Sequence, residues 1–427
     1  MDHSAHPPAT TPLSVGVIGG GVAGLTAAWL LSRGGCHVTI YEAAPVAGGR
    51  LRSVGTDPPL DVGSHLLVNA YHSTRRLISE LSASGKFHTP RTVAIQYRWQ
   101  SRTTKVRFAN LPASIRYPAA FLGSDLLQPR ERLTLLRQLI SLKLVGKRDT
   151  ISDSAASAFK ADMLASGKQL KQFWQLMTVS LFNTQLIDVE PLLLATTLQK
   201  LFLQDRGVDP ILPKSTVSAG IISPLLEQME QQNCELRLRM PVEKLLWREE
   251  SIEAVITPEG EQRHDRYILA LPLDRWCHLQ ECDTPVSGNT IATIYLRAVE
   301  PLSSALMTGF PDAPIHWLIR QETPEREGPL YAAVISDYNG SREELESIWQ
   351  LFKADYFPGR EINVLKTLIY HQAVPKQDTP FRRWRGLQRL SGENWDTIGD
   401  WTHPELPATV EAAIDSAMRL VESRFRI

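Results

Sequence analysis

A glycine-rich segment directly after a predicted buried strand restricts the fold of this chain more than any other feature. Residues 15–18 (VGVI) predict the strand, and Gly19-x-Gly21-x-x-Gly24 follows at the point where a helix should begin. In such a turn Gly19 permits the tight bend, Gly21 lets a pyrophosphate approach the backbone, and Gly24 lets the helix pack closely on the strand. The segment therefore predicts a dinucleotide site with its phosphates at a helix N-terminus.

The residues after the glycines complete a βαβ unit. Residues 23–32 are rich in alanine and leucine and predict a helix, and residues 37–41 (HVTIY) predict a second strand. Glu42 closes that strand 18 positions after Gly24, where an acid is expected to accept a ribose hydroxyl. A lone glycine motif most often indicates a plain turn, but this ordered set of elements favours nucleotide binding.

A Gly-Gly-Arg triplet follows Glu42 by six residues. Its arginine, Arg50, carries a planar fork of donors that suits phosphate oxygens. The triplet therefore adds a second set of predicted phosphate contacts. The predicted contacts in this part of the chain are Gly19, Gly21, Val22, Ala23, Gly24, Glu42, Gly49 and Arg50.

The loop that follows leads to a candidate catalytic residue. In a dinucleotide fold this loop passes beside the rest of the cofactor, which places Gly63, Ser64 and His65 near its ring system. His65 is the candidate acid. A hydrogen-bonded structural histidine is an equal interpretation of the same residue.

Composition excludes several classes of protein. Lys plus Arg equals Asp plus Glu at 46 each among 427 residues, so no basic excess points to nucleic acid. This length allows two or three domains with a large core. No stretch approaches the roughly 18 uninterrupted apolar residues of a membrane span, so any membrane contact is expected to be peripheral.

The N-terminus and the cysteines indicate the compartment. Residues 1–12 (MDHSAHPPATTP) have no basic region followed by an apolar core, so we expect a disordered lead-in instead of a signal peptide. The cysteines lack metal-ligand spacing and are expected to be reduced structural thiols. They are Cys36, Cys234, Cys277 and Cys282. We predict a cytoplasmic protein without a metal centre, with any membrane contact at the inner face.

A long region, residues 111–205, is predicted to be mainly helical. Within it, residues 114–148 combine apolar residues at helical spacing with basic ones. This segment fits contact with a membrane surface or a lid over an apolar substrate, and equally a domain helix with one solvated face. Residues 173–185 (FWQLMTVSLFNTQ) fit either an apolar tunnel or plain core. The basic residues are Arg116, Arg130, Arg132, Arg137, Lys143, Lys147 and Arg148.

The second half of the chain returns to strands. A helix at 221–232 and strands at 235–238, 252–256 and 266–272 indicate a second visit to the nucleotide-binding domain, with Val242 beside an adenine through its backbone. A helix near 342–353 and further strands indicate a mixed sheet that forms the floor of a substrate pocket. Those strands are predicted at 289–297, 316–320, 330–336 and 362–370.

A third visit is predicted at the end of the chain. Residues 394–398 (NWDTI) lead into Gly399-Asp400, and a helix is predicted at 410–423. The Asp400 carboxylate is placed to accept a ribityl hydroxyl. The helix N-terminus, at Ala408 and Thr409, faces phosphate or electron-rich ring atoms.

These motifs together resemble the FAD-dependent amine oxidase and carotenoid desaturase superfamily. The resemblance implies an α/β fold in which a discontinuous Rossmann-like domain binds FAD and a mixed-sheet plus helical domain holds the substrate. The implied FAD-binding domain comprises residues 14–75, 213–285 and 391–427. The implied substrate-binding domain comprises residues 76–212 and 286–390, with the candidate membrane-facing helices at 111–205.

Further motifs are similar to the hydroxysqualene dehydroxylases of bacterial hopanoid synthesis. The chain departs from that family in its polar strand at 394–398, and in Ala412 and Ala413, where the family tends to place a glycine. The similar motifs are Asp61-x-Gly63-x-His65-Leu66-Leu67 with Ala70-Tyr71, Leu111-Pro112-Ala113 ahead of 130–133 (RERL), Asn183-Thr184, and 399–402 (GDWT) with 406–411 (LPATVE).

That resemblance implies an apolar isoprenoid substrate, a C30 alcohol whose hydroxyl is allylic. Loss of water leaves a delocalised cation, and hydride from reduced flavin gives squalene, in a site that needs an acid and excludes water. A carotenoid or phytoene-type desaturase, an amine oxidase and a non-catalytic flavin-binding scaffold remain alternatives. The sequence assigns neither the electron donor nor the oligomeric state.

Overall fold

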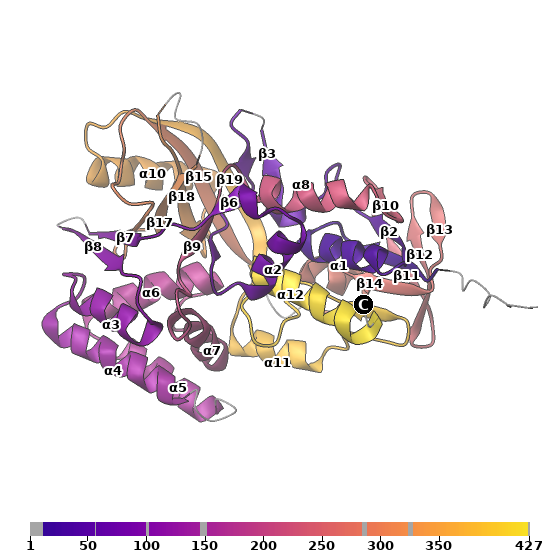
Figure 1. Ribbon diagram of the computed structural model, residues 1–427, viewed down its shortest axis with the longest axis horizontal. Coiled ribbons are helices and arrows are strands. Elements are labelled where there is room, and N and C mark those ends of the chain that lie inside the picture. The colour runs from indigo at the N-terminus through magenta and orange to yellow at the C-terminus, as the bar shows by residue number, and fades with distance from the viewer. Residues whose placement is uncertain are drawn as a thin grey trace, which may run out of the picture.

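The computed structural model describes residues 12–55, 57–99, 102–145, 152–283, 288–322 and 328–425. Residues 1–11 of the predicted lead-in at 1–12 lie outside these ranges, as do the basic residues Lys147 and Arg148. A parallel sheet lies at one end of the long axis, and a mixed sheet with a group of helices lies at the other (Figure 1).

The parallel sheet draws its strands from three separate parts of the chain, in the order β10-β2-β1-β14-β20. β1 lies at its centre, between β2 and β14, and is almost completely buried, as expected for a strand covered on both faces. Because all the strands run in parallel, the loops after β1, β2, β14 and β20 meet at one edge. The strands are β1 (Ser14–Ile18), β2 (His37–Tyr41), β10 (Cys234–Arg237), β14 (Arg266–Leu269) and β20 (Trp395–Thr397).

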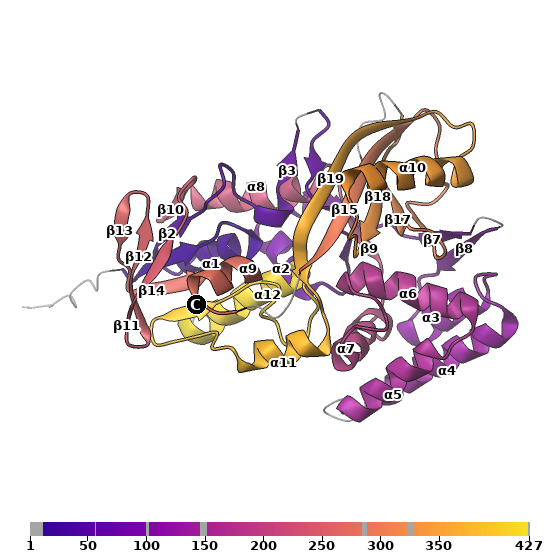
Figure 2. The ribbon, with the colours of Figure 1, turned by 180° about the vertical axis from the view of Figure 1, so that it is seen from behind.

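Each face of this sheet has its own cover, as Figures 1 and 2 show from opposite sides. Helices cover one face, and their apolar residues share one core cluster with β1 and β2. They are α1 (Val22–Arg33), α2 (His72–Glu80), α8 (Val217–Met229), and α12 (Val410–Leu420) with its extension Val421–Phe425. An antiparallel meander and two short helices form the cluster on the other face. They are β11 (Lys244–Arg248), β12 (Ser251–Thr257), β13 (Gly260–Gln262), α9 (Leu273–Leu279) and α11 (Thr379–Leu387).

The mixed sheet has the order β19-β15-β18-β17-β16-β7-β8, and β16 pairs with β7 in parallel. Side chains alternate between its two faces. Ile294 packs towards α10 (Arg342–Tyr356), and Tyr295 packs towards the helices of residues 113–202, called the helical unit below. The strands are β7 (Val93–Arg98), β8 (Thr103–Phe108), β15 (Gly288–Ala298), β16 (Met307–Gly309), β17 (Trp317–Gln321), β18 (Leu330–Ser336) and β19 (Ile362–Pro375).

The predicted helical region forms a separate layer of five helices beneath the mixed sheet (Figure 1). Phe173, Trp174 and Phe182 are fully buried there, so they belong to the core and not to the wall of a tunnel. Within the described ranges, no helix has both the length and the apolarity to cross a bilayer. The helices are α3 (Ala113–Leu122), α4 (Pro129–Val145), α5 (Asp153–Leu164), α6 (Lys168–Phe182) and α7 (Pro191–Phe202).

Short elements join the two halves of the molecule. β9 (Pro210–Pro213) pairs with both β5 (Leu67–Val68) and β6 (Phe87–His88) in a small sheet. The remaining short elements are the 3-10 turns Gly49–Leu51 and Ser84–Lys86 and the strands β3 (Ser53–Val54) and β4 (Leu60–Asp61). The α/β fold predicted from the sequence is confirmed, whereas the short strands β3 to β6, β9 and β16 and the helices α9 and α11 were not predicted.

Candidate functional site

Two of the three motif glycines are required by close packing. Gly19 has φ +109°, and a Cβ there would lie 2.3 Å from the carbonyl oxygen of Ala270 at the end of the neighbouring strand. A Cβ at Gly24 would lie 2.0 Å from the carbonyl oxygen of Gly19. Any side chain at either position would force the backbone of the turn, the helix or the strand to move.

The third glycine leaves space beside the helix. Gly21 is the N-cap of α1, with φ −77° and ψ 177°, and a Cβ there would meet no heavy atom within 4 Å. The helix has no side-chain cap and no acid in its first turn, which begins at Val22 and Ala23. This helix end is therefore open and electropositive, as an anion site requires.

The Gly-Gly-Arg triplet packs directly on the glycine turn. Gly48 N donates to Gly20 O at 2.8 Å. Gly49 has φ +54°, and a Cβ there would lie 3.1 Å from the Cα of Gly21. The exit loop of the βαβ unit is thus held against the start of α1, and Arg50 comes next in the chain.

Arg50 and Asp400 connect the two ends of the chain. Arg50 Nη2 lies 2.6 Å from Asp400 Oδ1, and Arg50 Nη1 lies 2.8 Å from Asp400 Oδ2. Arg50 Nη1 also donates to the carbonyl oxygen of Ala373 in β19, at 2.5 Å. Burial alone would lower the pKa of Arg50, but the Asp400 carboxylate outweighs it and raises that pKa, so the guanidinium stays charged. The parallel sheet and the mixed sheet meet at this group.

Glu42 lies where the sequence predicts it, at the end of β2. Its carboxylate accepts Gly20 N and Ala44 N, each at 2.7 Å. Each carboxylate oxygen keeps a further lone pair for a hydroxyl donor. The loop after β10 runs alongside Glu42, because Met240 N donates to Glu42 O at 2.8 Å. Val242 in that loop is buried in the core cluster between the meander and the parallel sheet.

The third predicted contact also lies at this edge. Gly399 has φ +143°, and its N–H donates to Ser416 Oγ in α12 at 3.0 Å. Thr409 is the N-cap of α12, and its hydroxyl accepts Ala412 N at 3.3 Å. Ala408 precedes it in the chain. The hydroxyl of Thr409 is therefore already occupied as a helix cap.

The loop with the candidate acid is held from several sides. His65 Nε2 lies 3.0 Å from Arg50 O, and since a carbonyl only accepts, Nε2 carries the proton. Burial lowers the pKa of His65, and burial raises the pKa of the nearby Asp61 carboxyl. Gly63 adjoins the ring, because a Cβ there would lie 3.2 Å from His65 Nε2, and Ser64 lies between them in the chain.

Three hydrogen bonds near this loop were not predicted from the sequence. Asp61 Oδ2 accepts Val217 N at 2.8 Å and so caps α8, and Tyr295 OH donates to Asp61 O at 2.7 Å. Ala373 accepts from Arg50 through its backbone. Backbone acceptors leave no trace in residue types, so only the aspartate at position 61 could have been marked from its place in the motif.

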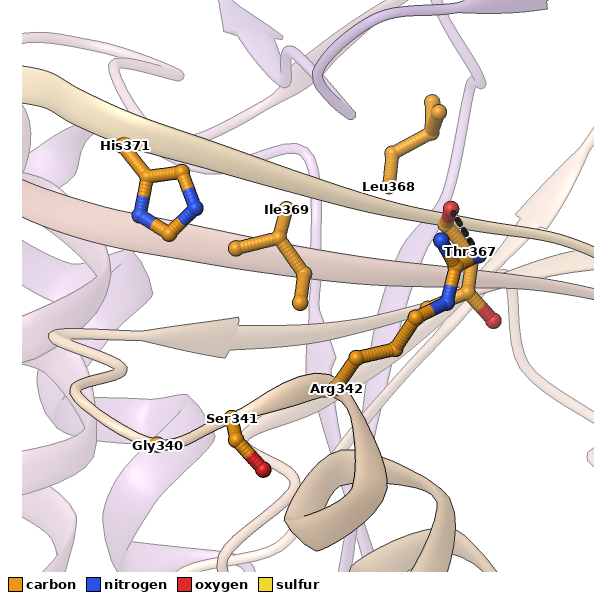
Figure 3. A pocket seen from close by; sticks show the side chains of 7 residues that line it. All are labelled: Gly340, Ser341, Arg342, Thr367, Leu368, Ile369 and His371. Atoms are coloured by element: carbon orange, nitrogen blue, oxygen red, sulfur yellow. Dashed lines mark hydrogen bonds between the residues drawn. The ribbon is translucent and has the colours of Figure 1, made fainter.

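A cavity of about 510 Å³ lies between β19 and the start of α10, and Figure 3 shows the side chains that line it. Arg342 Nη2 donates to Thr367 O at 3.4 Å along one side. Ile369 packs into the core cluster of α10, so the cavity adjoins that side of the mixed sheet and not the glycine edge of the parallel sheet. Its lining residues are Gly340, Ser341, Arg342, Thr367, Leu368, Ile369 and His371.

Comparisons with known proteins relate most of the chain to a flavin family and nearly all of it to hydroxysqualene dehydroxylases. Residues 22–285 match the family of flavin containing amine oxidoreductases. The hydroxysqualene dehydroxylase of Zymomonas mobilis subsp. mobilis is 22% identical over 94% of this chain and 96% of its own. That of Rhodopseudomonas palustris is 24% identical over 96% of this chain and 97% of its own.

Solved structures share the fold. An oxidoreductase from Methanosarcina mazei superimposes with a TM-score of 0.76 at 17% identity, over 96% of this chain and 100% of the other. Putrescine oxidase bound to putrescine gives a TM-score of 0.71 at 14% identity, over 98% of this chain and 100% of the other. At these identities the likeness concerns the fold alone.

Proposed function

Since the chain belongs to the family of flavin containing amine oxidoreductases and is an FAD-dependent oxidoreductase, we propose that it converts hydroxysqualene to squalene. The observation that supports this choice of substrate is the near full-length similarity to hydroxysqualene dehydroxylases of three bacteria, at 22%, 23% and 24% identity. The closeness of the three cofactor motifs in the structure supports the proposed mode of binding.

We propose that residues 14–75, 213–285 and 391–427 form the FAD-binding domain. The open backbone at Gly21 offers the space that a pyrophosphate needs, at an uncapped helix end. The free lone pairs of Glu42 suit a ribose hydroxyl of the adenosine half. The residues present therefore fit the cofactor.

The other predicted contacts follow the same axis. In this proposal Arg50 binds phosphate oxygens, Asp400 accepts a ribityl hydroxyl, and Val242 meets the adenine through its backbone. The start of α12 and the loop before His65 face the ring system. These last contacts are Ala408, Thr409, Gly63 and Ser64.

In this proposal residues 76–212 and 286–390 form the substrate-binding domain. The substrate lies between this domain and the edge of the parallel sheet where FAD binds. The reaction replaces a hydroxyl by hydrogen and releases water, so it consumes one hydride and one proton. Reduced FAD, when bound, supplies the hydride. The chain supplies the proton and an apolar enclosure, because water would trap the allylic cation. Leu66, Ile291 and Leu368 are partly buried apolar residues that pack on the aromatic core of the helical unit, and we propose that they line this enclosure.

His65 remains the proposed proton source. In the structure its neutral ring donates Nε2–H to Arg50 O, so that proton is already engaged. His65 therefore acts as an acid only when Nδ1 is also protonated, and its lowered pKa makes that form readily give up its proton.

We also propose that the outer face of α3 and α4 rests on a membrane. Ile115, Leu133 and Ile140 are exposed by 54%, 65% and 52% although they are large and apolar. On α4, Arg130 and Arg137 lie on the same exposed face as Leu133 and Ile140, because all four recur at spacings of three and four. Arg137 also pairs with Asp162. Apolar residues with basic neighbours suit an anionic lipid surface, where a C30 substrate would dissolve.

The direct test is a single turnover. Enzyme loaded with FAD is reduced under anaerobic conditions and mixed with hydroxysqualene. The lipid products are then separated and identified by mass spectrometry. Squalene together with reoxidised flavin supports the proposal. Unchanged alcohol beside flavin that stays bound and reduced rejects the substrate while leaving the FAD site intact, and it is also the result expected of a non-catalytic scaffold.

A further inference from the structure

The end of α9 folds back on itself in a defined turn. Cys282 N donates to Cys277 O at 3.0 Å, and Glu281 N donates to His278 O at 3.3 Å. Glu281 has φ +53°, in the left-handed region. These two bonds and this φ define a Schellman motif, in which the residue after the left-handed one contacts the third residue from the helix end. Here both contacting residues are cysteines.

The turn brings the two thiols within reach of each other. A 3.0 Å bond between Cys282 N and Cys277 O, added to standard bond lengths, holds the two Cα atoms less than about 7 Å apart. Disulfides span Cα separations of about 4.4–6.8 Å. Both thiols are free, and Cys282 packs against the same core cluster that contains Cys277.

We propose that Cys277 and Cys282 form a reversible disulfide by exchange with a small-molecule disulfide of the glutathione type. The Cys282 thiolate attacks the external disulfide, which releases one thiol and leaves a mixed disulfide on Cys282. The Cys277 thiolate then attacks the Cys282 sulfur and releases the second thiol. Two protein thiols are oxidised, and one external disulfide is reduced to two thiols.

Exposure fixes the order of these steps. Cys277 is only 2% exposed, whereas Cys282 is half-buried and accessible to the external disulfide. Burial and the neighbouring Cys282 raise the pKa of Cys277 to about 12, so Cys277 makes the slower, second attack.

The pair lies next to the proposed cofactor segment. Trp276 precedes Cys277 and donates to Thr397 Oγ1 at 3.0 Å, at the end of β20. The Trp276 ring meets the ring of Trp401, the neighbour of Asp400, with centroids 5.2 Å apart. The cysteine pair therefore lies close to the chain segment that carries Asp400. The proposal does not depend on which substrate the enzyme uses.

The test is a thiol map of the folded, full-length protein. After the folded protein has been incubated with glutathione disulfide, it is denatured in the presence of the alkylating reagent, so that buried free thiols are also labelled, and is then digested with trypsin. The peptide 276–297 contains both cysteines and no internal lysine or arginine before its last residue. We expect it unlabelled and lighter by two hydrogen atoms, and doubly labelled after treatment with dithiothreitol.

Two variants serve as controls. Cys234→Ser removes another half-buried thiol and should leave the disulfide unchanged. Cys282→Ser should leave Cys277 alkylatable. A wild-type peptide with two labels, or one with glutathione kept on Cys282 and a label on Cys277, would overturn the proposal. The wild-type digest alone decides between these outcomes, so a folding defect in a variant does not affect the result.

Discussion

Arg50 and Asp400 lie 350 positions apart in the chain and form a two-point ion pair, with N–O distances of 2.6 and 2.8 Å. The same guanidinium donates to Ala373 O in β19. One side chain therefore holds together the exit loop of the first βαβ unit, the end of the last strand of the parallel sheet, and the edge of the mixed sheet.

Removing the carboxylate of Asp400 should loosen this junction. Asp400 is 5% exposed and Arg50 is 29% exposed, so Asp400→Ala leaves a half-buried charge unpaired. We expect a loss of about 1–3 kcal/mol in the free energy of unfolding, because partial exposure screens the pair. Urea denaturation of the flavin-free protein measures it. Glu250→Gln, which breaks an exposed pair with Arg389, should change nothing measurable, and an equal effect in both variants would refute this role of Asp400.

His65 can be tested through the pH dependence of turnover. Because its pKa is lowered, the protonated form declines as the pH rises through a value below 6.5. We expect the wild-type rate to fall over that range, and the rate of His65→Gln to be lower and independent of pH there. Full turnover with an unchanged pH profile in His65→Gln would remove this residue from the mechanism.

A second histidine predicts how stability depends on pH. His316 accepts Ser336 N through Nδ1 at 3.0 Å, and burial lowers its pKa to about 4. Its unfolded form titrates near 6.5, so between these values the unfolded chain binds more protons. The stability from His316 is complete above about pH 6.5 and is lost as the pH falls towards 4, by at most about 3 kcal/mol.

His316→Asn keeps an acceptor for Ser336 N and cannot be protonated. Its unfolding free energy should therefore depend less on pH between 6.5 and 4 than that of the wild type. Burial also lowers the pKa of His264 to about 4. The unfolding free energy of the variant should therefore still depend partly on pH in this range. Identical slopes in wild type and variant would show that His316 does not titrate in this window.

The membrane proposal rests on α3 and α4. Replacing Leu133 and Ile140 together by serine should weaken co-sedimentation with vesicles of anionic lipid by about tenfold or more, because two exposed apolar contacts are lost. Leu387→Ser is the matched control, because Leu387 is 84% exposed but lies on α11. Equal losses in both variants, or no binding by the wild type, would reject this surface.

Much of the parallel sheet could be predicted because each of its elements carries its own local signal. The glycine turn, the acid after β2 and the final Gly-Asp mark chain positions that the fold brings together. The polar strand at 394–398 is the exception: β20 buries Asp396, and burial raises the pKa of its carboxyl. β20 pairs with β14, and its Trp395 is buried in the core cluster on one face of the sheet.

The contacts that join the two sheets could not be predicted, because they depend on tertiary structure. Ala373 accepts through its backbone, and Asp61 caps a helix 156 positions away. The short helix α11 did carry a signal, since Asp378 caps it and a proline follows in its first turn. β9 and β16 were missed because strands of four and three residues are too short for alternation to be recognised.

The central claim is that the turn at Gly21 holds the phosphates of FAD, and its most direct measurement is flavin content beside thermal stability in three glycine variants. Gly21→Ala adds a methyl group to open space at an allowed φ. We therefore expect the melting temperature of the flavin-free protein to be unchanged and its affinity for flavin to be lowered about tenfold or more. Gly24→Ala must displace Gly19 O and should lose both stability and flavin. Gly85→Ala, also with no neighbour within 4 Å, should lose neither. Full flavin retention by a stably folded Gly21→Ala protein would contradict the account.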